Sequence, residues 1–356
     1  MNLFFENKQI TGLLTVVPRH EQTFIEDMSG FNFPEARSRK LMEVMGYDKH
    51  RLVGSSDVCV SDLVVFGLQH LFEQNLLAQD DFDALVLVTQ TPDYQMPPTS
   101  NVVQGQLQLK QDLICIDINQ GCAGYIIGLM QAFLLLEQRS IRKVVLVNAD
   151  ILSRKTSSKD RNSYPLIGDA AAISIIERDP AGGAIHANIK MDGLRHQALM
   201  IPAGGMRLPH SVETAKLQDV GDGNLRAQDH LCMDGSAVFN FVQNEVPAMI
   251  SALMEYAGIS SEEIDWYLFH QPNRFMLQKL ADKMNVPYLK MPMNIVEQYG
   301  NSSGVTIPMV MTANLREFLV KDKALVCLAG FGVGLTWGSM LLRLGNMRFC
   351  EMIDFL

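Results

Sequence analysis

The sequence has no apolar run of membrane-spanning length. Runs such as Val144–Val147 are far shorter than the roughly 20 residues that a transmembrane helix needs. The first residues, Met1 to Gln9, carry charged side chains and lack the hydrophobic segment and cleavage site of a signal peptide. We therefore expect a cytoplasmic protein that does not insert into a membrane.

Blocks of basic residues are also missing. Lysine and arginine number 30 against 39 acidic residues, and the formal net charge is -9. Because proteins bind nucleic acid through clustered positive charge, this composition argues against a nucleic-acid partner. The 356 residues, 47% of them hydrophobic, suffice for one large core or for two domains that share one.

Cysteine motifs are absent as well. None of the six cysteines stands in a Cys-x-x-Cys pair, so we expect no disulfide framework and no metal site. We also expect no bound cofactor. Five of them suit a role as small buried hydrophobic residues, whereas Cys122 differs in its sequence context. The six are Cys59, Cys115, Cys122, Cys232, Cys327 and Cys350.

What the sequence does contain is an alternation of short β-branched runs with longer helical patterns. Such alternation is typical of an α/β fold with largely buried sheets. The strand-like runs are 84–89, 113–118, 144–149, 171–177, 266–269, 325–329 and 339–344. The helical patterns are 58–75, 125–138, 247–257, 275–284 and 308–319.

The sequence also contains an internal repeat. Three pairs of segments match at nearly one offset, 180 to 182 residues, which predicts two similar α/β halves. The pairs are Lys143–Asp150 with Lys323–Gly330, Asp83–Thr89 with Asp265–Gln271, and Asn119–Gly124 with Tyr299–Gly304.

We place the halves at residues 1–178 and 179–356. Residues 191–233, rich in proline and glycine, fit the pattern of neither half. A loop of this length is typically a lid or a binding loop, and a plain surface insertion is the alternative.

Cys122 lies between the strand-like run 113–118 and a nearly all-apolar helical pattern, in Asn119-Gln-Gly-Cys-Ala-Gly-Tyr125. Its small neighbours predict a tight turn that lets other backbone approach closely. At a helix start, free N–H groups and the helix dipole stabilise a thiolate, and the same amides can bind an oxyanion. Cys122 is therefore a candidate nucleophile, and a structural cysteine in a tight turn is the alternative.

Two further polar residues stand at comparable places. His270 ends the run 266–269, at the carboxyl edge of a strand, where open α/β sheets bind ligands. Asn301 lies in Tyr299-Gly-Asn-Ser-Ser-Gly304, the segment that the repeat matches to the Cys122 turn. Taken singly, each could be an ordinary strand-end or turn residue. Together, the repeat predicts that they meet Cys122 between the two halves.

Four motifs follow one another along the chain: Gly-Cys-Ala-Gly, His-Gln-Pro-Asn, Tyr-Gly-Asn-Ser-Ser-Gly-Val-Thr-Ile-Pro and Gly-Phe-Gly-Val-Gly-Leu-Thr-Trp-Gly. Together they resemble the β-ketoacyl-acyl-carrier-protein synthase III family of thiolase-fold condensing enzymes, over most of residues 80–345. The resemblance implies a five-layered αβαβα fold, a homodimer and a catalytic Cys-His-Asn triad at Cys122, His270 and Asn301.

The resemblance also implies a reaction. The cysteine takes an acyl group from acyl-coenzyme A or an acyl carrier protein. Malonyl on acyl carrier protein then loses CO2, and the carbanion attacks the acyl-enzyme. The backbone amides of Cys122 and Val333 would form the first oxyanion hole, although family members usually carry glycine where Val333 stands. Met96, Phe331 and Arg161 match substrate contacts, with Met96 reaching across the dimer.

Other positions depart from the family pattern. Lys40 and Val44 stand where relatives that use coenzyme A commonly carry the Trp and Arg that sandwich its adenine. The primer could therefore arrive on a carrier protein. Carrier proteins are acidic, so basic residues after His270 are candidates for docking, with an ordinary solvated helix face as the alternative. These residues are Arg274, Lys279 and Lys283.

Other readings of the same residues stay open at this point. Cys122 could pass its acyl group to a hydroxyl or an amine without forming a carbon–carbon bond. A thiolase would need Cys327 as a second cysteine, but Cys327 lies mid-strand, before the glycine-rich turn. A papain-like hydrolase does not explain the repeat, and an inactive partner subunit does not explain an intact set of three residues.

Overall fold

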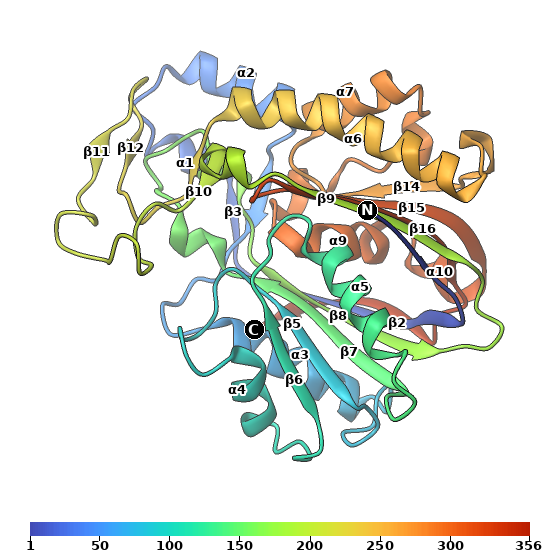
Figure 1. Ribbon diagram of the computed structural model, residues 1–356. Coiled ribbons are helices and arrows are strands. Elements are labelled where there is room, and N and C mark those ends of the chain that lie inside the picture. Colours follow the sequence, from blue (N-terminus) through green and yellow to red (C-terminus); the bar gives the residue numbers. More distant parts are fainter.

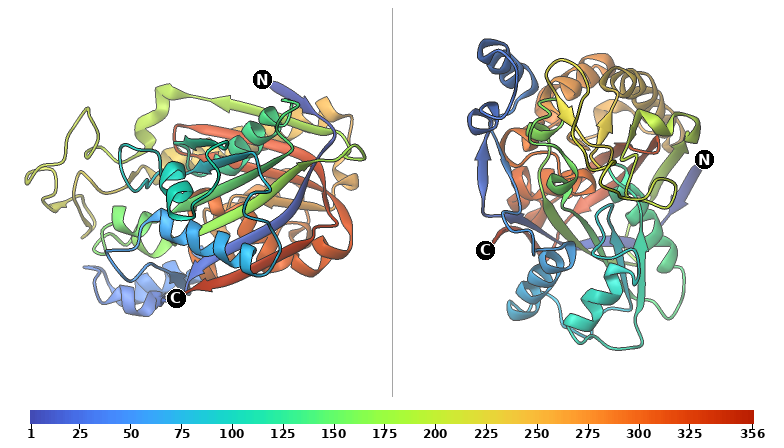
Figure 2. Two further views of the ribbon diagram at one scale, coloured as in Figure 1. Left: turned by 90° about the horizontal axis from the view of Figure 1, so that it is seen from below. Right: turned by 90° about the vertical axis from the view of Figure 1, so that its left-hand side faces the viewer.

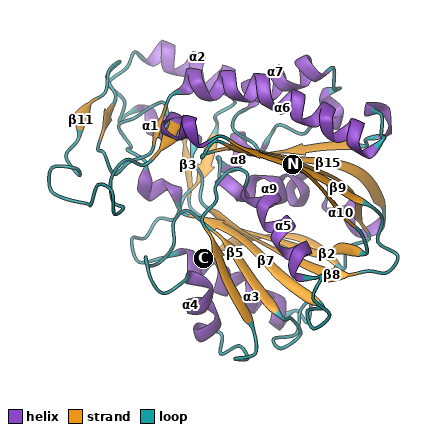
Figure 3. Ribbon diagram, viewed as in Figure 1, coloured by secondary structure: helices purple, strands orange, loops and turns teal.

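A computed structural model describes the whole chain, residues 1–356, as five layers of helix and sheet. One layer of helices lies between two β-sheets, and a further layer covers the outer face of each sheet, as Figures 1 and 3 show. This is the predicted αβαβα arrangement. No helix combines the length and the apolar content that crossing a bilayer requires.

The first sheet has six strands in the order β17-β2-β8-β7-β5-β6. Their bounds are Phe349–Phe355, Lys8–Pro18, Ala170–Arg178, Lys143–Asp150, Ala84–Val88 and Ile114–Ile118. The second sheet has five strands in the order β1-β9-β16-β15-β14. Their bounds are Asn2–Phe5, Ile185–Met191, Thr336–Gly345, Lys323–Gly332 and Trp266–Phe269.

The helices form three layers around these sheets. The middle layer holds α5 (Gly124–Leu135) and α9 (Thr306–Asn314), each of which contacts strands of both sheets. The outer layers hold α3 (Val60–Glu73) and α4 (Thr99–Gln106) on the first sheet, and α6 (Gly235–Ala257) and α7 (Arg274–Met284) beyond the second. The largest apolar cluster, 38 buried residues, surrounds the middle layer.

Shorter elements complete the fold. The helices are α1 (Phe24–Met28), α2 (Glu35–Met45), α8 (Ile295–Tyr299) and α10 (Arg316–Lys321), with 3-10 turns at Leu152–Lys155, Tyr164–Leu166, Gly193–Ala198, Ser261–Glu263, Tyr288–Lys290 and Ser303–Val305. The short strands are β3 (Glu21–Thr23), β4 (Lys49–Arg51), β10 (Leu199–Met200), β11 (Gln218–Asp219), β12 (Leu225–Arg226) and β13 (Cys232–Met233).

The two sheets repeat one pattern of strand pairing. In the first, β5 pairs parallel with β7, β7 antiparallel with β8, and β8 antiparallel with β2. In the second, β14, β15, β16 and β9 pair in the same succession. The offset matches along the sequence therefore correspond to equivalent strands in the structure.

The chain ends exchange between the sheets. Strand β1 pairs with β9 in the second sheet, whereas the C-terminal strand β17 pairs with β2 in the first. Strand β8 ends at Arg178, at the predicted division between the halves. A division at residues 178 and 179 thus remains our prediction for the chain's organisation, with one terminal strand crossing in each direction.

All seven predicted strands lie in the two sheets, and two predicted helices need correction. The helix predicted at 247–257 begins at Gly235, because Asp234 caps it and Pro247 lies in its interior. The helix predicted at 308–319 is two helices, since the backbone leaves helical geometry at Leu315 between α9 and α10.

Residues 191–233 contain one 3-10 helix and four strands of two residues each. The part around β11 and β12 projects from the body of the molecule, as Figure 2 shows. Its base returns to the fold through the pairing of Leu199 with Met233, just before helix α6 begins.

A glycine at the end of β16 tests the packing where the chain passes between the sheets. Gly345 has φ +137, and a Cβ atom there would lie 1.9 Å from the carbonyl oxygen of Asp322. We expect Gly345→Ala to lower the free energy of unfolding by about 3 kcal/mol through strain and displacement of that backbone. Urea unfolding measures this, with Gly183→Ala, which meets nothing within 4 Å, as the control. Equal stability of the two variants would contradict the packing described.

Candidate active site

Cys122 lies in the tight turn between β6 and α5, two residues before the helix begins. The predicted close approach of other chain segments is present. A Cβ atom on Gly121 would lie 2.7 Å from Val333 Cγ1, and one on Gly332 would lie 2.7 Å from Cys122 Sγ. The sulfur is therefore enclosed by the glycine-rich end of β15.

His270 follows β14 and is buried, with 2% of its surface exposed. Its Nδ1 lies 2.7 Å from Thr306 Oγ1. The Thr306 hydroxyl donates to the carbonyl of Ser303 at 3.0 Å, so its oxygen is free to accept from the Nδ1–H of His270. In this arrangement Nε2 carries no proton and is the nitrogen available to a reacting group.

Asn301 lies one residue beyond Gly300, after helix α8. Its Oδ1 accepts a hydrogen bond from the backbone N–H of Ser303 at 2.9 Å, which leaves the amide nitrogen as its free donor. Ser303 itself has φ 58, a left-handed conformation that is unusual for a residue other than glycine. The bond from Ser303 to Asn301 is one of the contacts that hold this conformation.

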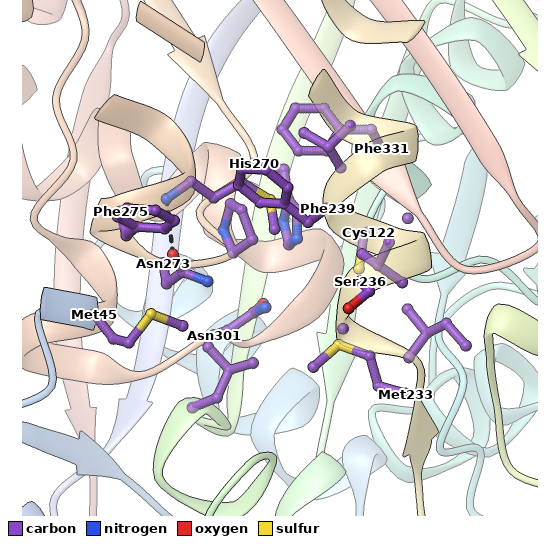
Figure 4. A pocket seen from close by; sticks show the side chains of 18 of the residues that line it. Met45, Cys122, Met233, Ser236, Phe239, His270, Asn273, Phe275, Asn301 and Phe331 are labelled. Carbon is purple, nitrogen blue, oxygen red and sulfur yellow. Dashed lines mark hydrogen bonds between the residues drawn. The ribbon is translucent and has the colours of Figure 1, made fainter. Parts of the chain in front are cut away.

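These side chains surround one cavity of about 430 Å³, shown in Figure 4. Eleven of its 19 lining residues are hydrophobic, so the cavity suits an apolar ligand more than a charged one. No aspartate or glutamate lines it. The lining residues are Met45, Cys122, Leu166, Leu199, Met233, Gly235, Ser236, Val238, Phe239, Asn240, Val242, His270, Pro272, Asn273, Phe275, Met276, Asn301, Phe331 and Gly332.

Burial sets the protonation state of both titratable groups in the cavity. It raises the pKa of Cys122 to about 11, against the opposing effect of hydrogen bonds from the amides of Val333 and Cys122 and from the Ser303 hydroxyl. It lowers the pKa of His270 to about 3. At neutral pH the pair is therefore a thiol and a neutral imidazole. The amide donors favour the thiolate as expected, but desolvation outweighs them in the resting protein.

A buried carboxyl group lies behind the sulfur. Asp150, the last residue of β7, accepts hydrogen bonds from Gln90 N–H at 2.7 Å and from the hydroxyls of Thr89 and Thr91, both at 3.2 Å. Burial raises the pKa of Asp150 to about 6, although the Ser303 hydroxyl and these donors act to lower it. When ionised, Asp150 further disfavours a thiolate at Cys122.

The structure brings together four of the predicted site residues in the cavity, namely Cys122, His270, Asn301 and Phe331. The ring of Phe331 packs edge-on against His270, with centroids 5.6 Å apart. Val333 does not line the cavity, but its backbone N–H bonds to Cys122.

The other predicted contacts lie outside the cavity lining. Met96 is 83% exposed, whereas Arg161 is buried away from the cavity. Arg274 donates to the carbonyl of Glu43 and to Glu297, and Lys283 donates to the carbonyl of Gln243 at 2.8 Å. The ammonium of Lys279 lies 3.9 Å from Asp282.

Sequence reasoning missed several residues that shape the site. Ser303 and Thr306 stand two and five residues after Asn301, inside the same motif, and the sequence does not indicate which of their side chains faces the histidine. Asp150 carried a usable signal, because a polar residue at the carboxyl end of a buried strand faces the ligand edge of the sheet. No group of three or more His, Cys, Asp or Glu residues is placed to hold a metal ion.

The raised pKa of Cys122 predicts a pH profile for its alkylation. A thiol with a pKa of about 11 is increasingly ionised up to that pH, so the rate of modification by iodoacetamide should rise about tenfold per pH unit from pH 7 to 10. Peptide mass spectrometry resolves Cys122 from the other cysteines, and Cys122→Ala identifies its signal. A rate that levels off below pH 8 contradicts the neutral thiol.

The glycine against the sulfur predicts a steric effect on reactivity. In Gly332→Ala, the new methyl group would lie 2.7 Å from Cys122 Sγ, so the sulfur or strand β15 has to shift. We expect the rate of Cys122 alkylation at pH 8 to fall about tenfold or more. Gly235→Ala is the matched control, because it lies in the same cavity wall and its Cβ meets nothing within 4 Å. Equal loss in both variants contradicts a specific block.

Comparison with known proteins supports one family. Residues 116–193 match the model of "3-Oxoacyl-[acyl-carrier-protein (ACP)] synthase III", and residues 254–344 match that of its C-terminal part. A putative 3-oxoacyl-[acyl-carrier-protein] synthase 3 of Campylobacter jejuni is 28% identical, over 98% of this chain and 97% of its own length.

Two further relatives extend the comparison. A beta-ketoacyl-[acyl-carrier-protein] synthase III of Fusobacterium nucleatum is 30% identical, over 82% of this chain and 86% of its own length. The crystal structure of a 3-oxoacyl-(acyl-carrier protein) synthase from Burkholderia xenovorans matches with a TM-score of 0.91 and 30% identity, over 100% of this chain and 99% of that one. The fold, the matched segments and these relatives together show that the chain belongs to the 3-oxoacyl-[acyl-carrier-protein] synthase III family of thiolase-fold condensing enzymes.

Proposed function

We propose that this protein condenses an acyl thioester primer with malonyl on acyl carrier protein, through an acyl group held on Cys122. The observation that carries the proposal is the meeting of Cys122, a neutral His270 and Asn301 in one largely apolar cavity. No cofactor is needed for this chemistry, since each step uses a thiol, an imidazole and amide donors.

In the first step, Cys122 attacks the carbonyl carbon of the primer thioester. Its thiol has a pKa of about 11 and needs a base. His270 Nε2 is free to accept the proton, because Nδ1 is turned to Thr306. In this proposal the backbone N–H groups of Cys122 and Val333, which bond to the sulfur at rest, donate to the oxyanion. The primer's thiolate leaves with the proton from His270, and the acyl group stays on the sulfur.

In the second step, malonyl thioester loses CO2, and the electron pair of the broken bond becomes an enolate. Asn301 offers its amide nitrogen to the enolate oxygen. His270 also donates to it as the other neutral tautomer, in which the single ring proton is on Nε2 and not on Nδ1. In that tautomer Nδ1 accepts from the Thr306 hydroxyl, which turns away from the Ser303 carbonyl. The enolate carbon then attacks the acyl carbonyl, and the Cys122 sulfur leaves. Since no carboxylate lines the cavity, no acidic side chain competes for these donors.

The state of Arg161 favours a carrier protein over coenzyme A as the source of the primer. The resemblance assigns this residue to nucleotide contact, yet its guanidinium carbon lies 3.5 Å from the ring centroid of Phe33. The guanidinium also donates to the carbonyl of Asp222 at 2.6 Å. Phe33 thus occupies one stacking face of Arg161, and Lys40 and Val44 offer no aromatic clamp in its place.

We further propose a homodimer that meets at the edge of the first sheet. Strand β6 has a single neighbour, β5, in its sheet, and Ile114 on it is 42% exposed. Tyr94 and Met96, on the adjacent loop, are 59% and 83% exposed. In this dimer Met96 would reach the partner's acyl pocket, where a flexible thioether accepts an apolar chain.

We propose that acyl carrier protein docks beside α7, in the cytoplasm, with Arg274, Lys279 and Lys283 as its contacts. All three side chains lie on the helix whose first turn contributes Phe275 and Met276 to the cavity. An acidic carrier bound there would hold its acyl arm toward Cys122.

The two steps predict separable losses. Incubation with acyl-carrier-protein thioesters should add one acyl mass to Cys122, and Cys122→Ala should abolish it. Asn301→Ala should keep this acylation within about threefold and lose malonyl-dependent CO2 release about a hundredfold or more. Intact-mass spectrometry and CO2 release measure the two steps. Acylation of Cys122 with transfer to an alcohol or an amine, and no CO2 release from malonyl, would mean simple acyl transfer instead.

A further inference from the structure

We propose that His50 is a positioning residue for Asn301 and acts through the backbone of Ile167. The inference rests on the proposed function, in which Asn301 donates to the enolate. His50 is the middle residue of strand β4, is 1% exposed and does not line the cavity. It therefore cannot touch a substrate and has to act through another residue.

The backbone of Asn301 is held in place by residues 166–168. Its N–H donates to the carbonyl of Leu166 at 2.7 Å, and its carbonyl accepts from the N–H of Gly168 at 3.2 Å. Asn301 and Ile167 form an isolated parallel β-bridge, which is not part of a longer strand pairing. The place of the Asn301 side chain consequently depends on whatever fixes residues 166–168.

His50 fixes the middle of this segment. Its Nδ1 lies 2.6 Å from the carbonyl oxygen of Ile167. Because a carbonyl only accepts, Nδ1 carries the proton and donates. In a parallel bridge, the carbonyl before Ile167 and the N–H after it face Asn301, so the Ile167 carbonyl faces the other way, toward β4. The next residue on β4, Arg51, accepts from the N–H of Asp169 at 2.9 Å.

The other ring nitrogen of His50 contacts a residue of helix α1. Nε2 lies 3.3 Å from Asp27 Oδ2, and the two side chains are 2% and 1% exposed. Neither atom has a hydrogen-bond partner. The ring of Tyr164 stands edge-on to the imidazole, with centroids 5.5 Å apart. These contacts orient the ring so that Nδ1 is aimed at Ile167. The imidazole thus has one hydrogen bond, directed to the active-site segment, and one polar contact, directed away from it.

Two substitutions separate the hydrogen bond to Ile167 from the contact with Asp27. In His50→Asn, the amide nitrogen can take the place of Nδ1 and keep the bond to Ile167, while the contact with Asp27 is lost. In His50→Gln, the longer side chain can place its amide near Nε2 and keep a partner for Asp27, while Ile167 loses its donor. Each variant can keep one of the two buried contacts of His50, so we expect both variants to fold.

We expect His50→Gln to lower malonyl-dependent CO2 release about tenfold or more and to change Cys122 acylation less than about threefold. His50→Asn should keep both rates within about threefold of the natural protein. Asp27 Oδ1 accepts from Gln22 in every variant, so only Oδ2 depends on residue 50. A purely structural role predicts the reverse order, because it favours the variant that keeps a partner for Oδ2. Thermal unfolding of both variants is measured alongside the rates.

The inference is overturned if His50→Gln keeps CO2 release, if both variants lose it equally, or if acylation falls in parallel. Asn301→Ala separates this result from the proposed function. If Asn301→Ala itself keeps CO2 release, the proposed role of Asn301 is wrong. If Asn301→Ala loses it and His50→Gln does not, only the positioning role of His50 is wrong.

Discussion

The chemistry of this site depends on limited access of water to the partly buried Cys122 and the buried His270 ring. The same burial raises the pKa of the thiol to about 11 and lowers that of the imidazole to about 3. Both groups are consequently neutral at rest, and no ion pair forms before a substrate arrives. Charge appears in the cavity only during reaction, where the amide donors are already in place. A dry cavity also protects an acyl-enzyme from hydrolysis.

Exclusion of water follows from how the two halves pack at the middle layer. The turns before α5 and α9 touch directly, because a Cβ on Gly304 would lie 3.0 Å from the carbonyl oxygen of Gly121. Strand β15 closes the other side, where a Cβ atom on Gly330 would lie equally close to the backbone of the Cys122 turn. Side chains at these places would hold the halves apart. The internal repeat therefore does more than duplicate a fold, since it puts two equivalent helix starts in contact and makes the site from both.

The sequence predicted the frame of the molecule well because its signals are local. Buried strands such as Ala84–Val88 are continuous β-branched runs, and the repeat supplied the pairing between distant turns. The site residues Cys122, His270 and Asn301 were found because each stands at a strand end or a glycine-flanked turn. The N-terminal strand Lys8–Pro18 was missed because it alternates less clearly and lies outside the repeat segments. The helical pattern from 247 begins too late, because Pro247 lies in the interior of α6 and Asp234 caps its start.

What could not be predicted was the balance between opposing effects and the partners of long side chains. A helix start favours a thiolate, and only the structure shows that burial outweighs it at Cys122. The Arg161 side chain matches a nucleotide contact, and only the structure shows Phe33 against it. Sequence gives the residue type at a position, but desolvation and side-chain stacking are set by segments that are far away along the chain.

Charge near the cavity mouth constrains how an acidic carrier could be recognised. The protein carries a formal net charge of -9, so long-range repulsion opposes the approach of such a partner. On α7, the guanidinium of Arg274 faces Glu297 and the ammonium of Lys279 faces Asp282, which partly neutralises both. Lys283 donates only to a neutral carbonyl and keeps its full charge.

The rim between these charges is aromatic. Phe239 and Phe275 stack with centroids 5.9 Å apart, and both line the cavity. Since exposed ion pairs contribute little to affinity and salt screens them further, a carrier held at this mouth has to gain most of its binding energy from short-range contacts with the rim and from the acyl arm inside the cavity. The basic residues of α7 then serve to orient the carrier more than to hold it, and the apolar lining that keeps water from Cys122 also supplies the attraction that brings the acyl group to it.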